Sequence, residues 1–205
     1  MRRGFPVIST VIVVVSVAIM IGLGLWQLLI RLPEKEAQLA QLAGNPARPA
    51  IAFPLAPDDR LLFRRSEAVC REVTGISRAG AGNAGFRLIA DCRTVAGPVI
   101  KVQLGTTRDP MKVVSWAGGA VSGWVSHAPD STPLVARLFD HKPQQMLLVA
   151  ETPVAGLTAN TRPDVGMVPN NHLAYAGQWF FFAAIAAVIY VLALRRRRTP
   201  PPPRT

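Results

Sequence analysis

The segment FPVISTVIVVVSVAIMIGLGLWQLLI, residues 5–30, runs for 26 positions without an Asp, Glu, Lys or Arg. A second segment without these charges, LAYAGQWFFFAAIAAVIYVLAL, covers residues 173–194. A helix needs roughly 20 apolar residues to cross the hydrocarbon core of a bilayer. Both segments meet this length. The sequence therefore predicts a membrane protein with two spanning helices, and it excludes a freely soluble cytoplasmic enzyme.

The start of the first segment also resembles a secretory signal, because Arg2 and Arg3 precede the apolar run. The apolar region of a signal is only about 7 to 15 residues long and ends at small residues. This run is longer and ends in LWQLLI, residues 25–30. We therefore expect an anchor that stays attached. With no Ser- and Arg-rich transit peptide before it, we expect the anchor to lie in a bacterial plasma (inner) membrane.

The distribution of charge predicts the orientation of the two spans. The formal net charge is +11, and seven of the 23 basic residues lie at the two ends, whereas residues 31–172 hold 16 basic and 12 acidic residues. Basic residues beside a span stay on the cytoplasmic side. We expect cytoplasmic termini, a periplasmic domain over residues 31–172 and a basic, Pro-rich cytoplasmic tail over residues 195–205. Contact with anionic membrane lipid accounts for the Arg run, so no nucleic-acid partner is expected.

The segment between the spans predicts a short helix followed by a mainly β domain. Residues 31–43 are rich in helix formers, with Pro33 suited to a first turn, and a Pro-rich connector follows. Apolar alternation then predicts five or six short strands, which favours a small antiparallel barrel or a sandwich. The candidate strands are residues 69–76, 86–92, 99–104, 112–116, 121–125 and 145–150.

The stretch GAGNAG, residues 80–85, matches the G-x-G-x-x-G pattern of dinucleotide sites. Such a site needs the last glycine to open a helix. Gly85 instead opens FRLI, residues 86–89, which is typical of a strand. We therefore interpret the stretch as a hairpin turn and expect no dinucleotide cofactor.

The two cysteines fall on the two arms of this hairpin. If the arms pair symmetrically, with Ile76 facing Phe86, then Cys70 lies opposite Cys92. Directly opposed residues of an antiparallel pair are close enough for a disulfide, and the periplasm is oxidising. We expect a structural disulfide. A copper site built from the two thiolates is the weaker alternative, because 21 intervening residues give no recognised metal-binding spacing.

Enzyme motifs are missing from the sequence: it has no G-x-S-x-G, no H-E-x-x-H and no P-loop. His127 and His141 lie in segments rich in Pro, Asp and Ser, where we expect exposed loops. A periplasmic hydrolase whose residues meet only in space stays open as an alternative. Its candidate residues are the three histidines, His127, His141 and His172, with Asp130, Asp140 and Asp164.

His172 differs because it lies at the outer mouth of the second span. At 100° per residue it shares one helix face with a stripe that is aromatic above and small below. Gly22, Gly24, Trp26 and Gln27 lie at the same outer level of the first span. Two interpretations stay open: an interfacial belt with an Asn cap, or a neutral imidazole that faces a flat apolar ligand between the spans. The stripe consists of Tyr175, Ala176, Trp179, Ala183, Ala186 and Tyr190.

Two blocks at these mouths resemble the signature ends of the SURF1 family of cytochrome c oxidase assembly factors. They are GLGLWQL, residues 22–28, followed by Arg31, and NNHLAYA with QWF, residues 170–176 and 178–180. The stretch GFRLIA, residues 85–90, is similar to the family as well. The resemblance implies a role in assembly and no catalysis.

The resemblance also implies a cargo and partners. The cargo is haem a, made by haem a synthase and destined for cytochrome c oxidase subunit I. His172 matches the candidate ligand of the haem iron, and we expect Tyr175, Trp179, Trp26 and Gln27 to line the site. A membrane-anchored scaffold that assembles the oxidase without binding haem is the alternative.

Overall fold

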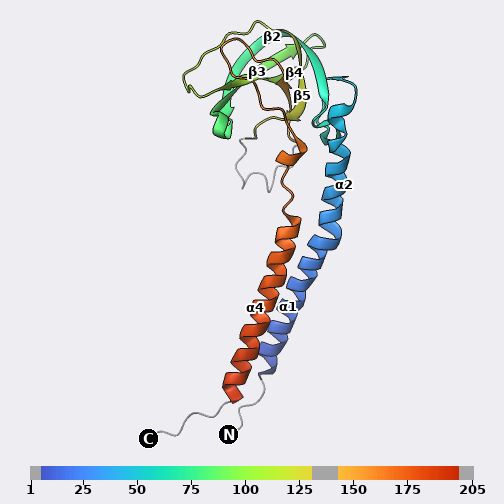
Figure 1. The fold of residues 1–205 in the computed structure, drawn as a ribbon, viewed down its shortest axis with the longest axis vertical. Coiled ribbons are helices and arrows are strands. Elements are labelled where there is room, and N and C mark those ends of the chain that lie inside the picture. Colours follow the sequence, from blue (N-terminus) through green and yellow to red (C-terminus); the bar gives the residue numbers. More distant parts are fainter. Residues whose placement is uncertain (1–5, 131–142, 199–205) are drawn as a thin grey trace. The chain divides into compact units, whose positions relative to one another are not determined.

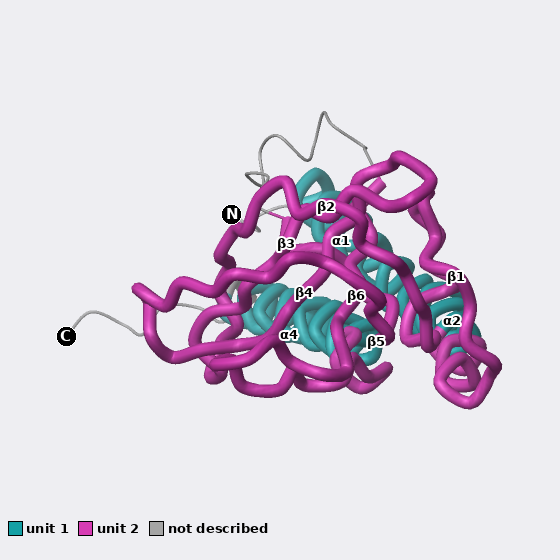
Figure 2. The backbone as a smooth tube through the Cα atoms, turned by 90° about the horizontal axis from the view of Figure 1, so that it is seen from above, with its two compact units in different colours: residues 1–38, 169–205 teal, residues 39–168 magenta. Residues whose placement is uncertain are grey.

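The computed structural model describes residues 6–130 and 143–198, and within it the chain divides into two compact units. Unit 1 comprises residues 1–38 and 169–205, and unit 2 comprises residues 39–168 (Figure 2). Unit 1 is helical and unit 2 is mainly β. The architecture thus confirms the expected pair of long apolar helices at the two ends of a mainly β domain.

Unit 1 is a pair of helices that run side by side (Figure 1). Helix α1, Val7–Trp26, continues through a π-helical turn, Gln27–Arg31, into α2, Leu32–Ala43. Helix α4, His172–Arg198, packs along α1. Both long helices are long and apolar enough to cross a membrane.

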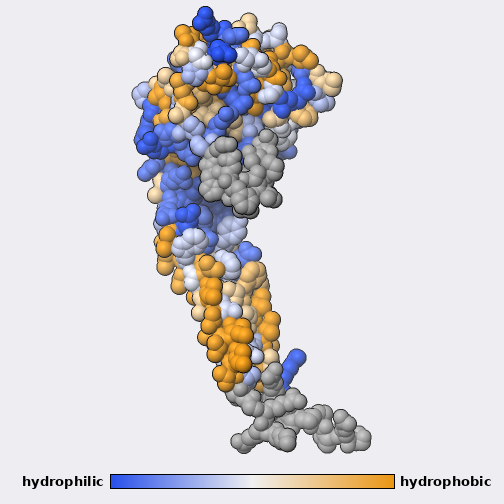
Figure 3. Space-filling model, turned by 180° about the vertical axis from the view of Figure 1, so that it is seen from behind, coloured by the Kyte–Doolittle hydropathy of each residue, from blue (hydrophilic) through white to orange (hydrophobic). Residues whose placement is uncertain are grey.

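The surface of this helix pair is apolar (Figure 3). Ile8 is 78% exposed, and Leu29, Phe181 and Ile189 are each more than 60% exposed. Contiguous apolar surface of this extent is unfavourable in water. Such a surface is suited to contact with lipid, which suggests membrane association of the helix pair.

Unit 2 is built on one sheet in the described part of the chain. Its hydrogen-bonded order is β1-β2-β3-β4-β6-β5, and β5 also pairs with β2, so that the order returns to β2 and closes a ring of five strands. Short 3-10 turns at residues 45–47, 59–61, 82–84 and 165–167 connect or flank the strands. The strands are β1, Ile51–Ala52; β2, Arg65–Gly80; β3, Phe86–Thr94; β4, Val99–Thr107; β5, Gly119–His127; and β6, Met146–Ala150.

The prediction of an antiparallel sheet is wrong for two pairs of strands. β4 and β6 are parallel, and so are β1 and β2, whereas the other pairs are antiparallel. The first exception has a topological cause. Strand direction cannot alternate around a ring with an odd number of strands, so one of the five ring pairs must be parallel.

The predicted strand at residues 112–116 is irregular in the structure. Its side chains nevertheless alternate between solvent and core: Val113 is 85% exposed, while Val114 and Trp116 pack against the core. The segment therefore closes over the core as a loop without pairing to a neighbouring strand.

The core of unit 2 lies inside the ring. Val102 and Leu104 of β4, Val125 of β5 and Leu148 of β6 are at most 1% exposed. All five residues of β6 are buried. Met146 and Leu148 belong to the main core cluster, whereas Leu147 and Val149 pack with Ile89 and Ala128 in a second cluster. Both faces of β6 are thus covered, which is why it is apolar throughout and does not alternate.

A disulfide joins Cys70 and Cys92 with a Cα–Cα distance of 5.5 Å. The symmetric register expected for this hairpin is wrong, because β2 extends to Gly80, which pairs with Phe86 across a tight turn. Two bulges in β2 reduce this shift from the expected register but do not remove it, so Cys70 pairs with Thr94 and not with Cys92. The disulfide is therefore diagonal across the two strands and not between directly opposed residues.

Removing both cysteines tests the contribution of this bond. A disulfide that closes a loop of this length stabilises a fold by about 3 kcal/mol, mainly by restricting the unfolded chain. We expect the double variant Cys70→Ala and Cys92→Ala to unfold at lower denaturant concentration than the oxidised wild type, measured by circular dichroism of the detergent-solubilised protein. The reduced wild type is the control and should behave like the variant. Equal midpoints for oxidised wild type and variant would contradict the expectation.

Candidate functional site

Within unit 1, a hydrogen bond links the two helix segments that carry the sequence blocks described above. His172 Nδ1 lies 2.7 Å from Gln27 Oε1. His172 is the first residue of α4, and Gln27 is the first residue of the π-helical turn. Both side chains are half-buried. The structure thus brings together two of the predicted site residues that are 145 positions apart in the sequence.

The turn that carries Gln27 is wider than an α-helical turn. The Leu32 N–H donates to the Gln27 carbonyl oxygen, five residues earlier. Pro33 explains this local widening, because it has no N–H to offer the carbonyl of Leu29 and its ring clashes with that carbonyl. Single π turns inside helices are frequent at functional sites. The helix therefore passes through Pro33 without starting anew there, in contrast to the predicted first turn.

Close helix packing lies one turn before Gln27. Gly24 is buried, and a Cβ atom placed there would lie 2.8 Å from the Phe180 ring. Gly22 is exposed and a Cβ atom there would meet nothing within 4 Å. Small residues let helices approach each other closely, so Gly24 is the position that allows α1 and α4 to meet at this level.

The stripe of α4 that was expected to share a face with His172 is mostly covered. Ala176 and Ala183 are 2% and 4% exposed, and Trp179 is half-buried. Tyr175 is 49% exposed. The small residues of the stripe thus lie inside the helix pair, and Tyr175 is at its margin, where an amphipathic ring suits a membrane interface.

Trp26 is 44% exposed, and its ring is covered by a cation. The guanidinium carbon of Arg31 lies 5.7 Å from the ring centroid, and Arg31 Nη1 also pairs with Glu34 Oε2 at 2.8 Å. The observed partner of Trp26 is therefore Arg31, which places a positive charge and an aromatic face at the same helix mouth.

Asn170, two residues before His172, has a side-chain oxygen that is buried without a hydrogen-bond partner. This oxygen consequently does not cap α4, which leaves Asn171 as the other candidate for the Asn cap that the sequence predicted. An unsatisfied buried carbonyl costs about 1 to 3 kcal/mol, which makes it a position where a water or a ligand donor is expected.

The other histidines lie elsewhere. His127, the last residue of β5, is 2.8 Å from Asp59 through Nε2, an acidic partner that sequence spacing did not reveal. A catalytic His–Asp pair needs a buried carboxylate that orients the ring, whereas the Asp59 side chain is 63% exposed. The contact is therefore a hydrogen-bonded pair at the surface. Asp164 caps the turn Val165–Met167 through Gly166 N. His141 and Asp140 lie outside the described residues.

Metal binding by clustered side chains receives no support from the described part of the chain. Residues 6–130 and 143–198 contain no group of three or more His, Cys, Asp and Glu side chains that could hold an ion. The two cysteines are bonded to each other.

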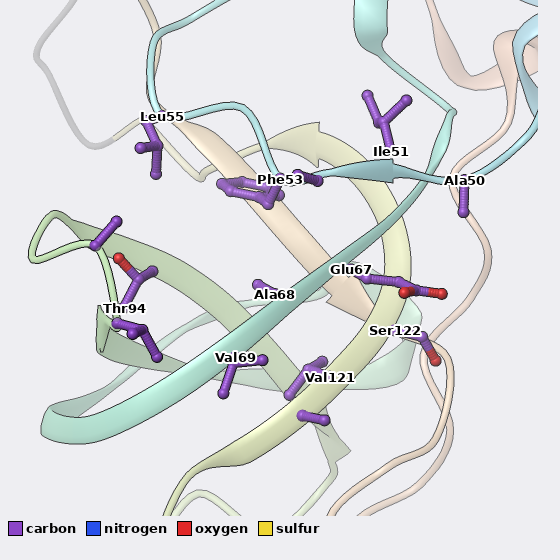
Figure 4. A pocket seen from close by; sticks show the side chains of 14 residues that line it. Ala50, Ile51, Phe53, Leu55, Glu67, Ala68, Val69, Thr94, Val121 and Ser122 are labelled. Carbon is purple, nitrogen blue, oxygen red and sulfur yellow. The ribbon is translucent and has the colours of Figure 1, made fainter.

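Unit 2 contains a groove of about 800 Å³ that the sequence did not predict (Figure 4). Its side chains come from β1 and the segment that follows it, from β2 and β5, and from the turn after β3. Phe53, Leu55, Val69 and Val121 make it mostly apolar, with Glu67 at one side. The only signal in the sequence was the presence of apolar residues near prolines, and this signal does not indicate that the four segments lie close together.

Comparison with known proteins gives one match. The family model described as the SURF1 family matches residues 14–184, a range that includes most of α1, all of unit 2 and the first half of α4. Comparisons with curated proteins and with solved structures gave no match.

Enlarging the two glycines of α1 tests the close packing beside Gln27. Gly24→Leu forces its side chain against Phe180, and such overpacking costs roughly 1 to 3 kcal/mol. We expect a lower midpoint of thermal unfolding for the purified protein in detergent. Gly22→Leu is the matched control, since it adds the same side chain to open space, and it should leave the midpoint near that of the wild type. An equal loss of stability in both variants would show that Gly24 has no special role.

Proposed function

The chain belongs to the SURF1 family, which indicates a role in cytochrome c oxidase assembly, and on this premise we propose that it holds haem a at His172 for insertion into the oxidase. The observation that carries the proposal is the His172–Gln27 hydrogen bond. This bond uses Nδ1 of the imidazole. It leaves free the other ring nitrogen, Nε2, which commonly binds haem iron.

The chemistry of the neighbouring residues supports this cargo. Haem a combines a flat apolar ring with a hydrocarbon arm that carries a hydroxyl donor. Asn170 offers a buried oxygen without a partner, which could accept such a donor. Arg31 supplies a cation at the same helix mouth, suited to the carboxylates of the ring. The long apolar helices are where the hydrocarbon arm would partition.

A carrier must also release what it binds. A single protein ligand holds a haem less firmly than two strong axial ligands, and His172 is the one histidine in the described part of unit 1. The protein's contribution would be to bind and orient the haem, and no chemical step on it is required. We therefore propose an assembly factor and not an enzyme.

We further propose that the protein lies in a bacterial inner membrane, with both termini cytoplasmic and with unit 2, as a small closed barrel, in the periplasm. The closed strand order supports the barrel, and the Cys70–Cys92 disulfide supports an oxidising compartment. The proposed partners are cytochrome c oxidase subunit I, haem a synthase and membrane lipid, with no nucleic acid.

One observation favours the second candidate function, a scaffold that contacts other proteins without binding haem. Leu55, Val69 and Val95 line the groove of unit 2 and are each more than half exposed. Exposed apolar residues around a groove are typical of surfaces that meet a partner. Both functions belong to oxidase assembly, and they differ in whether purified protein carries haem.

Reporter fusions test the proposed orientation. An alkaline phosphatase that is active only in the periplasm should be active when fused after Pro98 and inactive when fused after Arg198, because the basic residues beside both spans favour the cytoplasmic side. Enzyme activity per amount of fusion protein is the measurement. The opposite pattern would overturn the orientation and with it the outer position of His172.

Substitution of His172 tests the cargo. In a host that makes haem a, we expect the wild type to copurify with haem and His172→Ala to lose it by about tenfold, the effect of a loss of 1.4 kcal/mol in binding. His127→Ala is the control and should retain haem. The measurement is the Soret absorbance after size exclusion. Haem retained by His172→Ala would contradict the proposal, and absence of haem from the wild type would favour the scaffold.

A further inference from the structure

We infer that Gln27 fixes the tautomer of His172, holding the ring proton on Nδ1 and leaving the Nε2 lone pair available for a metal. The inference about the proton depends only on the hydrogen bond in the helix pair. What the lone pair binds rests on the proposed function. Gln27 is in this sense a positioning residue that acts on the cargo through His172.

The argument starts from the inventory of donors and acceptors. A neutral imidazole has one N–H and one unprotonated nitrogen, and a carboxamide oxygen can only accept hydrogen bonds. Because Gln27 Oε1 lies 2.7 Å from His172 Nδ1, Nδ1 must be the donor. The proton is therefore on Nδ1, and Nε2 carries the lone pair. Histidine ligands are commonly oriented by a hydrogen bond of their other nitrogen in this way.

The fold holds Gln27 in position through two features described above. The π-helical turn begins at Gln27, with the Leu32 N–H bonded to its carbonyl. The contact between Gly24 and Phe180 brings the two helices together one turn away. The bond also lies in a half-buried environment, where water competes less for both groups than at an exposed site.

The orientation of the amide decides the chemistry. With its nitrogen toward His172, Gln27 would donate to Nδ1, the proton would move to Nε2, and the ring could not bind a metal through that atom. Gln27→Glu has only acceptors at this position and so preserves the bond with Nδ1–H. Gln27→Met has neither a strong donor nor a strong acceptor, while it keeps an unbranched side chain that suits a helix.

Nitrogen-15 NMR of histidine-labelled protein in lipid bilayers reads the tautomer directly, and the signals of His172 are those that disappear in His172→Ala. We expect Nδ1 of the wild type to be protonated and Nε2 unprotonated, and Gln27→Glu to keep the Nδ1 proton. Gln27→Met should move the proton toward Nε2, the tautomer that a neutral histidine side chain favours in water. Gln178→Met, the same change at an exposed position of α4, should leave the tautomer unchanged. A protonated Nε2 in the neutral wild type would overturn the inference.

Titration with iron protoporphyrin then separates the two proposals. Loss of a hydrogen bond to a metal-binding histidine weakens binding roughly ten- to a hundredfold. We expect this loss for Gln27→Met, wild-type affinity for Gln178→Met, and affinity at least as high as the wild type for Gln27→Glu. If the wild type carries the Nδ1 proton but does not bind the porphyrin, only the proposed haem site is contradicted. If the wild type and Gln27→Met bind the porphyrin with equal affinity, only the role of Gln27 is contradicted.

Discussion

A helix pair surrounded by lipid must satisfy its polar side chains from within, and this constraint explains the contacts of unit 1. Water is absent from the hydrocarbon core, so a polar group there finds a partner on a neighbouring helix or remains costly. Thr10 and Tyr190 hydrogen-bond to each other, as do Gln27 and His172. The first pair joins α1 to α4, and the second joins the π-helical turn after α1 to α4. Among the described residues of unit 1, the buried oxygen of Asn170 departs from this pattern, because it has no hydrogen-bond partner, and it lies two residues before His172.

Unit 2 depends on a different constraint, the closure of its sheet through one long strand. β2 pairs with β5 over Arg65 to Cys70 and with β3 from Cys70 onward. Cys70 is thus the residue at which β2 changes partners, with Gly119 on one side and Thr94 on the other. The disulfide to Cys92 ties β2 to β3 at this position. A covalent bond there holds β2 to β3 where bulges interrupt their hydrogen bonding.

The sequence predicted what depends on composition and periodicity, and it failed where the outcome depends on distant contacts. Uncharged runs were sufficient for the two spans, and alternation was sufficient for most strands. The hairpin register was wrong because bulges in β2 have no signal of their own. Their positions at the outer ends of the two spans placed Gln27 and His172 at one level, but the 2.7 Å contact between their side chains has no signal in the sequence. The pair of His127 and Asp59 spans 68 residues, a separation at which spacing carries no information.

The choice of an amide, and not a carboxylate, as the partner of His172 is consistent with a site that must let its ligand go. A carboxylate would increase the basicity of the imidazole and strengthen the bond to a metal. The neutral Gln27 orients the ring without adding charge. If His172 holds a haem as proposed, Gln27 orients the ring and adds less ligand strength than a carboxylate would, which suits a carrier that must release what it binds.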